Sequence, residues 1–234
     1  MRADGTVLAI RDHHPAIATD WATGSAGQVK IPRAVRSKRN GDQLCMAICK
    51  ADLIRAHDTG SLPPFLFFWK PDGSVPVLGA ECLSQWYPSA FMHEGVEYKT
   101  AEHWMMHRKA LLFGDHDMAG RILGESRPSR VQQLGRRISG FQLEGWVAAR
   151  FDIVVQGNLF KFEQSPRLLD FLLSTHPAIL VEASPQDRLW GIGLRSDDPE
   201  ALDPRTWPGD NLLGFALMKV RQHLQSVPPS PGPE

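Results

Sequence analysis

The sequence predicts a helix-rich α+β fold, in which a single domain with a small sheet follows an N-terminal appendage. Segments with the pattern of strands are few and short, whereas segments with helical start and stop signals are longer and more numerous. The two kinds do not alternate as they would in a doubly wound α/β protein. With 234 residues and 42% hydrophobic content, the chain is long enough to bury a sizeable core.

The two ends of the chain differ from its middle. Residues 1–61 contain short apolar pieces, turn signals and a basic patch between Lys30 and Arg39, so they are predicted to form an appendage of unknown role. The patch is either a solvated segment or a contact for phosphates. Residues 226–234 are dominated by proline and are predicted to be a disordered tail. The predicted domain therefore spans residues 62–225.

Short apolar or alternating segments, bounded by turn residues, predict the strands. The first two flank a turn at Pro71-Asp72-Gly73, and the next two form a hairpin that turns at Glu94-Gly95. The last is apolar through most of its length, which is typical of a buried strand. These segments are residues 65–70, 75–78, 90–92, 96–98 and 178–183.

Six further segments have helical patterns with recognisable start or stop residues. Thr100 is the expected N-cap of the first helix and Asn211 that of the last, while Pro128 and Pro166 introduce two of the others. The predicted helices cover residues 100–113, 117–123, 129–138, 144–162, 166–173 and 212–224.

Composition narrows the functional classes. Twenty-six basic and twenty-six acidic side chains cancel, so no global field attracts the chain to DNA or to an anionic membrane. The longest apolar run, residues 65–69, is far too short to span a bilayer, and no signal segment is visible. The three cysteines have no metal or redox spacing and are interpreted as reduced thiols. We expect a cytoplasmic protein without a membrane partner, and the sequence makes no prediction of its oligomeric state.

The predicted helix at residues 100–113 carries an unusual set of polar side chains. Glu102 and Lys109 share one face, two turns and roughly 10 Å apart, which suits opposite ends of a small ligand. The alternative is an ordinary amphipathic helix with a solvated polar face. His103 and His107 have the spacing of zinc ligands, but a third ligand is missing, so neither a metal nor another cofactor is expected. A second segment of interest, residues 186–193, contains glycines that suggest a close approach of the backbone.

Several short motifs of the predicted domain occur together in a known family. The chain resembles the NADAR family, also called YbiA-like, over about residues 65–224. It departs from that family at Ser84-Gln85-Trp86, where Ser-Asn-Phe is common, and at residues 104–108. The motifs that carry the resemblance are Phe68-Trp69, Leu83-Ser84-Gln85-Trp86, Tyr98-Lys99-Thr100-Ala101-Glu102-His103, Lys109-Ala110, Gly135-Arg136, Lys161-Phe162, Leu180-Val181-Glu182, Asp187-Arg188-Leu189-Trp190-Gly191-Ile192-Gly193 and Gly209-Asp210-Asn211-Leu212-Leu213-Gly214.

The resemblance implies a YbiA-like fold and N-glycosidase chemistry, in which the bond between a base nitrogen and a ribose phosphate is hydrolysed. One branch of the family acts on riboflavin-pathway ribosyl-phosphate intermediates, and another removes ADP-ribose from guanine in nucleic acid. The expected substrate is therefore an ADP-ribosylated guanine nucleic acid or a ribosyl-phosphate metabolite. Two other functions stay open: a non-catalytic ADP-ribose or nucleotide-binding module, and a scaffold whose basic appendage recruits RNA or a partner.

N-glycoside cleavage builds positive charge on the ribose, so it requires a carboxylate, an activated nucleophile or water, and a phosphate clamp. Glu102 is the first candidate for the carboxylate, and a position at a helix start should keep it ionised. Lys109 either binds phosphate or forms a Schiff base with the aldehyde of an opened ribose. Lys161 is the competing lysine, with an exposed cation near a helix end as its alternative reading.

The remaining candidates follow from the same resemblance. Asp187 is expected to hold a ribose hydroxyl or orient water, although this segment could also be a tight turn around a core tryptophan. Arg136 and Asn211 rank lower, because a solvated helix face and helix capping also explain them. The expected substrate contacts, in full, are Trp69, Gln85, His103, Arg136, Lys161, Trp190, Gly191, Gly193 and Asn211.

Overall fold

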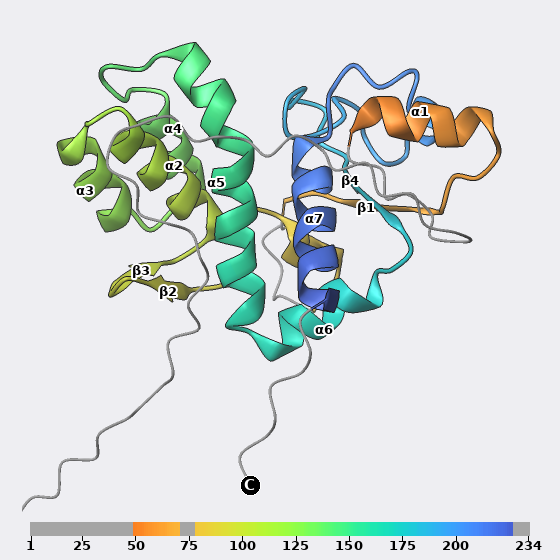
Figure 1. Cartoon of the computed structure of the whole chain (residues 1–234). Helices are drawn as coiled ribbons and strands as arrows, with labels where there is room; N and C mark the ends of the chain where they lie inside the picture. The colour runs from red at the N-terminus through yellow and green to blue at the C-terminus, as the bar shows by residue number, and fades with distance from the viewer. Residues whose placement is uncertain (1–48, 71–77, 227–234) are drawn as a thin grey trace, which may run out of the picture. The chain divides into compact units, whose positions relative to one another are not determined.

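The computed structural model describes residues 49–70 and 78–226, and it confirms a helix-rich α+β architecture with little sheet (Figure 1). Within these residues, no helix combines the length and the apolar character that a membrane crossing requires. In chain order the elements are α1 (Lys50–Asp58), β1 (Phe65–Phe68), the short 3-10 helix η1 (Ala80–Leu83), β2 (Phe91–His93), β3 (Val96–Tyr98), α2 (Ala101–Leu112), α3 (His116–Gly124), α4 (Pro128–Gly135), α5 (Leu143–Glu163), α6 (Pro166–Ser174), β4 (Ile179–Glu182), η2 (Pro199–Leu202) and α7 (Leu212–Ser226).

The described strands form two separate two-stranded sheets. β1 runs parallel to β4, with Phe68 opposite Glu182, although the two strands lie far apart in the sequence. β2 and β3 form the predicted hairpin, and its turn residues Glu94 and Gly95 have φ values of 50° and 78°. Two consecutive left-handed residues are what a tight hairpin turn of type I′ requires. The strand predicted at residues 75–78 falls largely outside the described residues.

Helix α2 is the central helix of the group formed by α2, α3, α4 and α5. It packs against α3, α4 and α5, and the predicted N-cap is confirmed because the Thr100 hydroxyl accepts a hydrogen bond from the His103 backbone. All of its first seven residues, 101–107, are buried. The alternative of an amphipathic helix with a solvated polar face is therefore wrong, because Glu102 on that face is only 2% exposed.

Two close backbone contacts bring the helices and strands together. At Gly157 of α5, a Cβ atom would lie 2.3 Å from the Trp104 ring, whose indole N–H donates to the Ile153 carbonyl at 2.8 Å. At Gly214 of α7, a Cβ atom would lie 2.1 Å from the Leu180 carbonyl of β4. Helices α5 and α7 also pack against each other, so α7 joins the β1–β4 pair to the rest of the core (Figure 1).

Asn211 does not cap α7 as predicted. Its φ is 55°, outside the extended range of an N-cap, and its side chain faces β4 instead. The amide Oδ1 accepts from the Glu182 backbone at 3.0 Å, and Nδ2 donates to the Leu180 carbonyl at 2.9 Å. Asn211 therefore satisfies backbone groups of β4 in place of a neighbouring strand.

Part of the predicted appendage belongs to the domain. The compact unit runs from Cys45 to Glu234, and α1, inside the predicted range 1–61, buries Leu53 completely in the main core. The Lys50 ammonium also donates to the Trp207 carbonyl. The boundary therefore lies before α1, because Leu53 supplies core surface that composition alone does not reveal. The basic patch and the Pro-rich tail predicted at residues 226–234 lie outside the described residues, except for Ser226 at the end of α7.

Candidate active site

Glu102 is a buried carboxyl at the start of α2. Its side chain is only 2% exposed, and its Oε1 has no hydrogen-bond partner. Burial raises its pKa to about 8, and the nearby charge of Asp187 adds to this, while a hydrogen bond from Trp86 and the charges of Arg136 and Lys109 oppose it. The expectation that the helix start keeps Glu102 ionised is wrong, because the loss of water outweighs the helix dipole.

The structure gathers four of the predicted site residues. Asp187, Arg136 and Lys109 all lie close enough to Glu102 for their charges to shift its pKa. They come from three places: α2 itself, the end of α4 and the loop after β4. The charges of two cations and of a second carboxyl thus act on Glu102, although no single segment of sequence contains all four residues.

Lys109 is partly buried, which sequence could not establish. Its Nζ donates to the Gly135 carbonyl at 2.9 Å and lies 4.5 Å and 5.3 Å from the ring centres of Phe141 and Trp146. Burial lowers its pKa, while the charge of Glu102 raises it. A desolvated amine beside a carboxyl is the environment in which a lysine becomes a nucleophile.

The loop around Asp187 is held largely by its own chain. Asp187 Oδ1 accepts from the backbone N–H groups of Leu189 and Trp190, both at 2.8 Å, which leaves Oδ2 free of described protein partners. At Gly191 a Cβ atom would lie 2.8 Å from the Glu182 carbonyl, and Gly193 has a φ of 75°. The close approach expected of these glycines is thus made to the protein's own backbone. Trp190 is partly buried and packs against the core.

Lys161 is buried instead of exposed. Only 1% of it is accessible, and its Nζ donates to the carbonyls of Cys82 and Ser84 at 2.5 Å and 2.9 Å. Burial lowers its pKa to about 7. One turn earlier, Asn158 donates to the Gln85 side chain at 3.0 Å. These two residues of α5 therefore fix the segment that ends in Trp86, the hydrogen-bond donor to Glu102.

His103 is anchored by both of its ring nitrogens. Nδ1 lies 2.8 Å from the Thr100 hydroxyl, and Nε2 lies 3.1 Å from the Glu125 carbonyl. A carbonyl can only accept, so Nε2 carries the hydrogen and Nδ1 accepts from Thr100. His103 thus ties the start of α2 to the end of α3. Over the described residues, no three His, Cys, Asp or Glu side chains are placed to hold a metal ion.

Replacing Lys161 with Met should destabilise the protein more at pH 10 than at pH 7. The folded-state pKa is depressed, so between about pH 7 and 10.5 the wild-type unfolded state binds more protons, and wild-type stability rises with pH. The Met variant lacks this rise in stability and leaves the Cys82 and Ser84 carbonyls without donors. At pH 10 the wild-type amine is neutral, so its removal relieves no buried charge, and the lost hydrogen bonds lower the free energy of unfolding by about 2 kcal/mol or more. Urea unfolding of both proteins at the two pH values measures this. A difference that shrinks toward pH 10 would refute the neutral, hydrogen-bonded amine.

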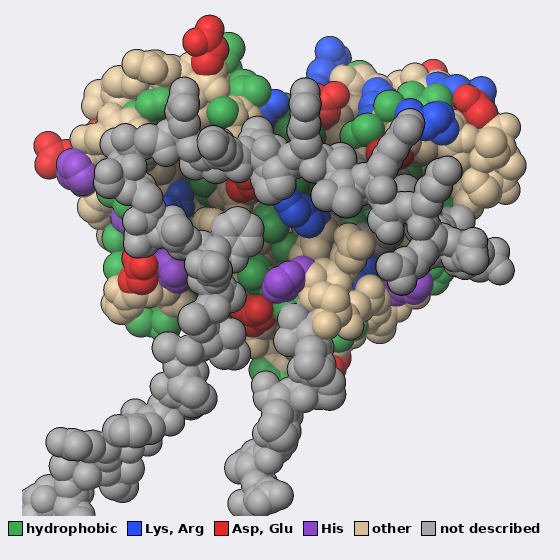
Figure 2. All heavy atoms as spheres, in the orientation of Figure 1, with side chains coloured by type: hydrophobic (Ala, Val, Ile, Leu, Met, Phe, Trp, Pro, Cys, Tyr) green, Lys and Arg blue, Asp and Glu red, His purple; other side chains and the backbone are tan. Residues whose placement is uncertain are grey.

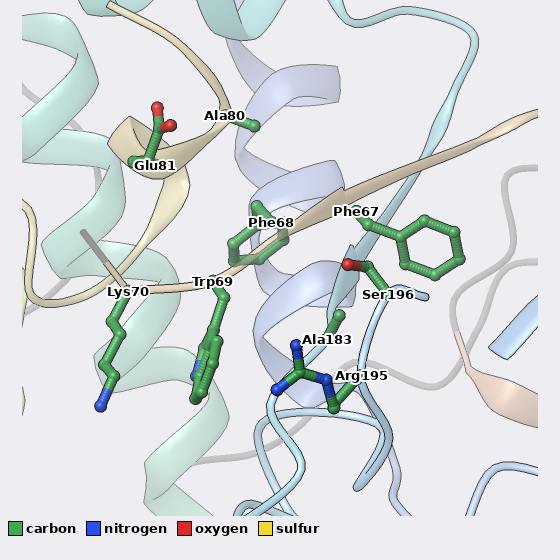
Figure 3. Close-up of a pocket in the computed structure, with 9 residues that line it drawn as sticks. All are labelled: Phe67, Phe68, Trp69, Lys70, Ala80, Glu81, Ala183, Arg195 and Ser196. Atoms are coloured by element: carbon green, nitrogen blue, oxygen red, sulfur yellow. The ribbon is translucent and has the colours of Figure 1, made fainter. Parts of the chain in front are cut away.

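A pocket of about 250 Å³ lies at the end of β1 (Figure 3). Trp69 and the Arg195 guanidinium point to the same side of it, with Lys70 beyond Trp69. Neither Glu102 nor Lys109 lines this pocket, because the Glu102 carboxyl is covered. Lys70, which lines the pocket, places its Nζ 5.9 Å from the ring centre of Trp86. On the visible surface in Figure 2, acidic and basic side chains are interspersed, in keeping with the formal net charge of zero.

Comparison with known proteins identifies the family. The sequence pattern of the NADAR domain matches residues 67–225. The chain belongs to the NADAR family. N-glycosidase R617 of Acanthamoeba polyphaga mimivirus is 43% identical over 152 residues, which cover 63% of this chain and 89% of that protein. Protein irg-1 of Caenorhabditis elegans is 38% identical over 162 residues, which cover 62% and 76% of the two chains.

A solved structure supports the predicted NADAR fold. The NMR structure of the Escherichia coli protein YbiA matches this chain with a TM-score of 0.55 and 24% sequence identity, and the match covers 70% of this chain and 86% of YbiA. At this identity the likeness concerns the fold alone. The helix-rich architecture with little sheet is thus confirmed as YbiA-like.

Sequence reasoning missed two groups of this NADAR site. Trp86 was noted only as a departure from the family motif, yet it is hydrogen-bonded to Glu102. Glu182 was read as the end of a buried strand, yet its Oε2 is buried without a partner and its pKa is raised to about 8. A signal for Glu182 was available, because a carboxyl that ends an apolar strand needs a reason to be buried.

Proposed function

We propose that this NADAR protein is an N-glycosidase that hydrolyses the bond between a base nitrogen and an (ADP-)ribose phosphate. The observation that carries the proposal is the buried carboxyl of Glu102, which has one unpartnered oxygen and lies among Lys109, Arg136 and Asp187. A folded protein retains an unsatisfied buried carboxyl at a cost, so its presence favours a chemical role. The names of related N-glycosidases support the same reaction class.

Burial opposes the charged forms of both Glu102 and Lys109, which favours transfer of the ammonium proton to the carboxyl before the chemical step. The neutral amine of Lys109 then attacks C1′ of the ribose, and the bond from C1′ to the base nitrogen breaks. Glu102 gives its proton to the ring oxygen and takes one from the new ammonium on C1′, which opens the ribose and leaves a protonated Schiff base on Lys109. Water adds to this carbon and releases the sugar aldehyde with the free amine. The alternative, in which Lys109 only binds phosphate, lacks support from its depressed pKa.

The surrounding residues take supporting roles. The free Oδ2 of Asp187 binds a ribose hydroxyl, and Arg136, which is exposed, binds phosphate. Trp69, beside the pocket, and Trp190 offer aromatic faces to the base. We do not assign His103, Lys161 or Asn211 to direct substrate contact, because their polar atoms are occupied by the protein. Gln85, Gly191 and Gly193 shape the site through contacts within the chain. We place the reaction in the cytoplasm.

The substrate is tested by mass spectrometry of the full chain, incubated separately with a guanine-ADP-ribosylated oligonucleotide and with pyrimidine ribosyl-phosphate precursors of riboflavin. Release of ADP-ribose with restored guanine assigns the nucleic-acid substrate, and release of ribose phosphate assigns the metabolite. Binding of ADP-ribose without release of any base would replace the proposal with the non-catalytic nucleotide-binding module.

A further inference from the structure

Glu182, at the end of β4, is a partly exposed residue whose side chain has one buried oxygen atom and whose backbone is held by two hydrogen bonds. Its backbone N–H donates to Asn211 Oδ1 at 3.0 Å, and its carbonyl accepts from the Ile192 N–H at 2.9 Å. The absence of a side chain at Gly191 allows that second contact, since a Cβ atom there would lie 2.8 Å from the Glu182 carbonyl. The backbone of Glu182 is thus held from both sides, while its side-chain Oε2 is buried and unpartnered.

The charges around Glu182 differ from those around Glu102. In the described part of the chain, the groups whose charges act on Glu182 are Asp187, in the loop after β4, and Glu102, on α2, and both are carboxyls. Glu102 also faces Lys109, Arg136 and the Trp86 N–H, which all favour its ionised form. Among these neighbours Glu182 has no cation that favours its ionised form, so its carboxyl, like that of Glu102, holds a proton at neutral pH. Burial and the two neighbouring carboxyls raise the pKa of Glu182 to about 8.

We infer that Glu182 is a catalytic acid of this site, which donates the proton of its buried carboxyl to the nitrogen of the departing base. The inference rests on the proposed N-glycosidase function. As Lys109 bonds to C1′, the electron pair of the glycosidic bond passes to the base nitrogen, which takes the Glu182 proton and leaves as the neutral base. The ionised Glu182 recovers a proton from the water that later hydrolyses the Schiff base. A base without this proton is a poor leaving group.

The test compares wild type, Glu182→Gln and the exposed control Glu97→Gln in single-turnover base release between pH 5 and 8, on whichever substrate the wild type cleaves. Glu182→Gln should be slower by on the order of 10²-fold at pH 7. Its rate should rise as the pH falls, because the proton must then come from solvent, whereas the wild-type and Glu97→Gln rates stay level between pH 5 and 7, where Glu182 is protonated, and fall only toward pH 8. Glu182→Asp, which retains an acid, should keep the level profile at a reduced rate.

Different results separate the inference from the proposed function. If the wild type cleaves a substrate and Glu182→Gln is equally fast, or slower with an unchanged pH profile, Glu182 is not the acid. If the wild type cleaves neither substrate, the proposed function fails. Infrared difference spectra of wild type against Glu182→Gln at pH 6.5 then show independently whether Glu182 is protonated. Loss of a protonated-carboxyl band in the variant supports the inference, and loss of a carboxylate band overturns it.

Discussion

Replacing Glu102 with Gln should reduce base release by at least about 10³-fold while the protein stays folded. Gln matches the size of Glu and can keep the contact with Trp86, but it can neither accept the proton of Lys109 nor return one to the ribose. Steady-state release of base, measured by mass spectrometry, gives the loss. Glu97→Gln, on the exposed face of β3, is the matched control and should retain full activity.

The same variant should be more stable than wild type at pH 8. The folded-state pKa of Glu102 is raised from 4.5 to about 8, so the folded protein keeps a proton that the unfolded chain loses above about pH 4.5. Wild-type stability therefore falls as the pH rises through this window, and Gln removes that fall. We expect a Tm increase of about 2–4 °C or more at pH 8, and a smaller one at pH 5. Equal Tm values at both pH values would show that Glu102 is not a buried acid.

Local sequence signals predicted the elements that frame the site. Thr100 starts α2 because its hydroxyl can accept from a backbone N–H three residues later, and the hairpin turns at Glu94-Gly95 because Gly95 adopts positive φ without steric cost. Such signals depend on neighbours in the sequence. They are available before any packing is known.

The missed features depend on contacts between distant segments. Lys161 resembles any lysine near a helix end, and only the packing of α5 against η1 places its amine beneath two carbonyls. The pairing of β1 with β4 likewise joins strands from opposite ends of the domain. The ionisation of Glu102 was predicted from the helix dipole, a local effect, and was overturned by burial, a tertiary one. Spacing could place Glu102 and Lys109 on one face, but not their surroundings.

Replacing Lys109 with Arg should abolish both turnover and covalent trapping. Arginine retains the positive charge and can still donate to the Gly135 carbonyl. If Lys109 only binds phosphate, the variant should therefore keep partial activity. The guanidinium stays protonated and cannot attack C1′. If Lys109 is the nucleophile, the variant should therefore lose turnover by on the order of 10⁴-fold or more. The comparison of one variant thus separates the two roles.

Borohydride supplies the direct measurement, since it reduces a Schiff base to a stable secondary amine. Wild type treated with substrate and borohydride should gain the mass of the reduced sugar phosphate on the peptide that contains Lys109, and Lys109→Arg should gain none. Lys99→Arg is the matched control, because Lys99 is held by the carbonyl of Glu125 at 2.7 Å and should be trapped like wild type. An adduct that persists in Lys109→Arg would move the nucleophile elsewhere. Turnover near the wild-type rate in that variant would return Lys109 to phosphate binding and leave Glu102 to activate water directly.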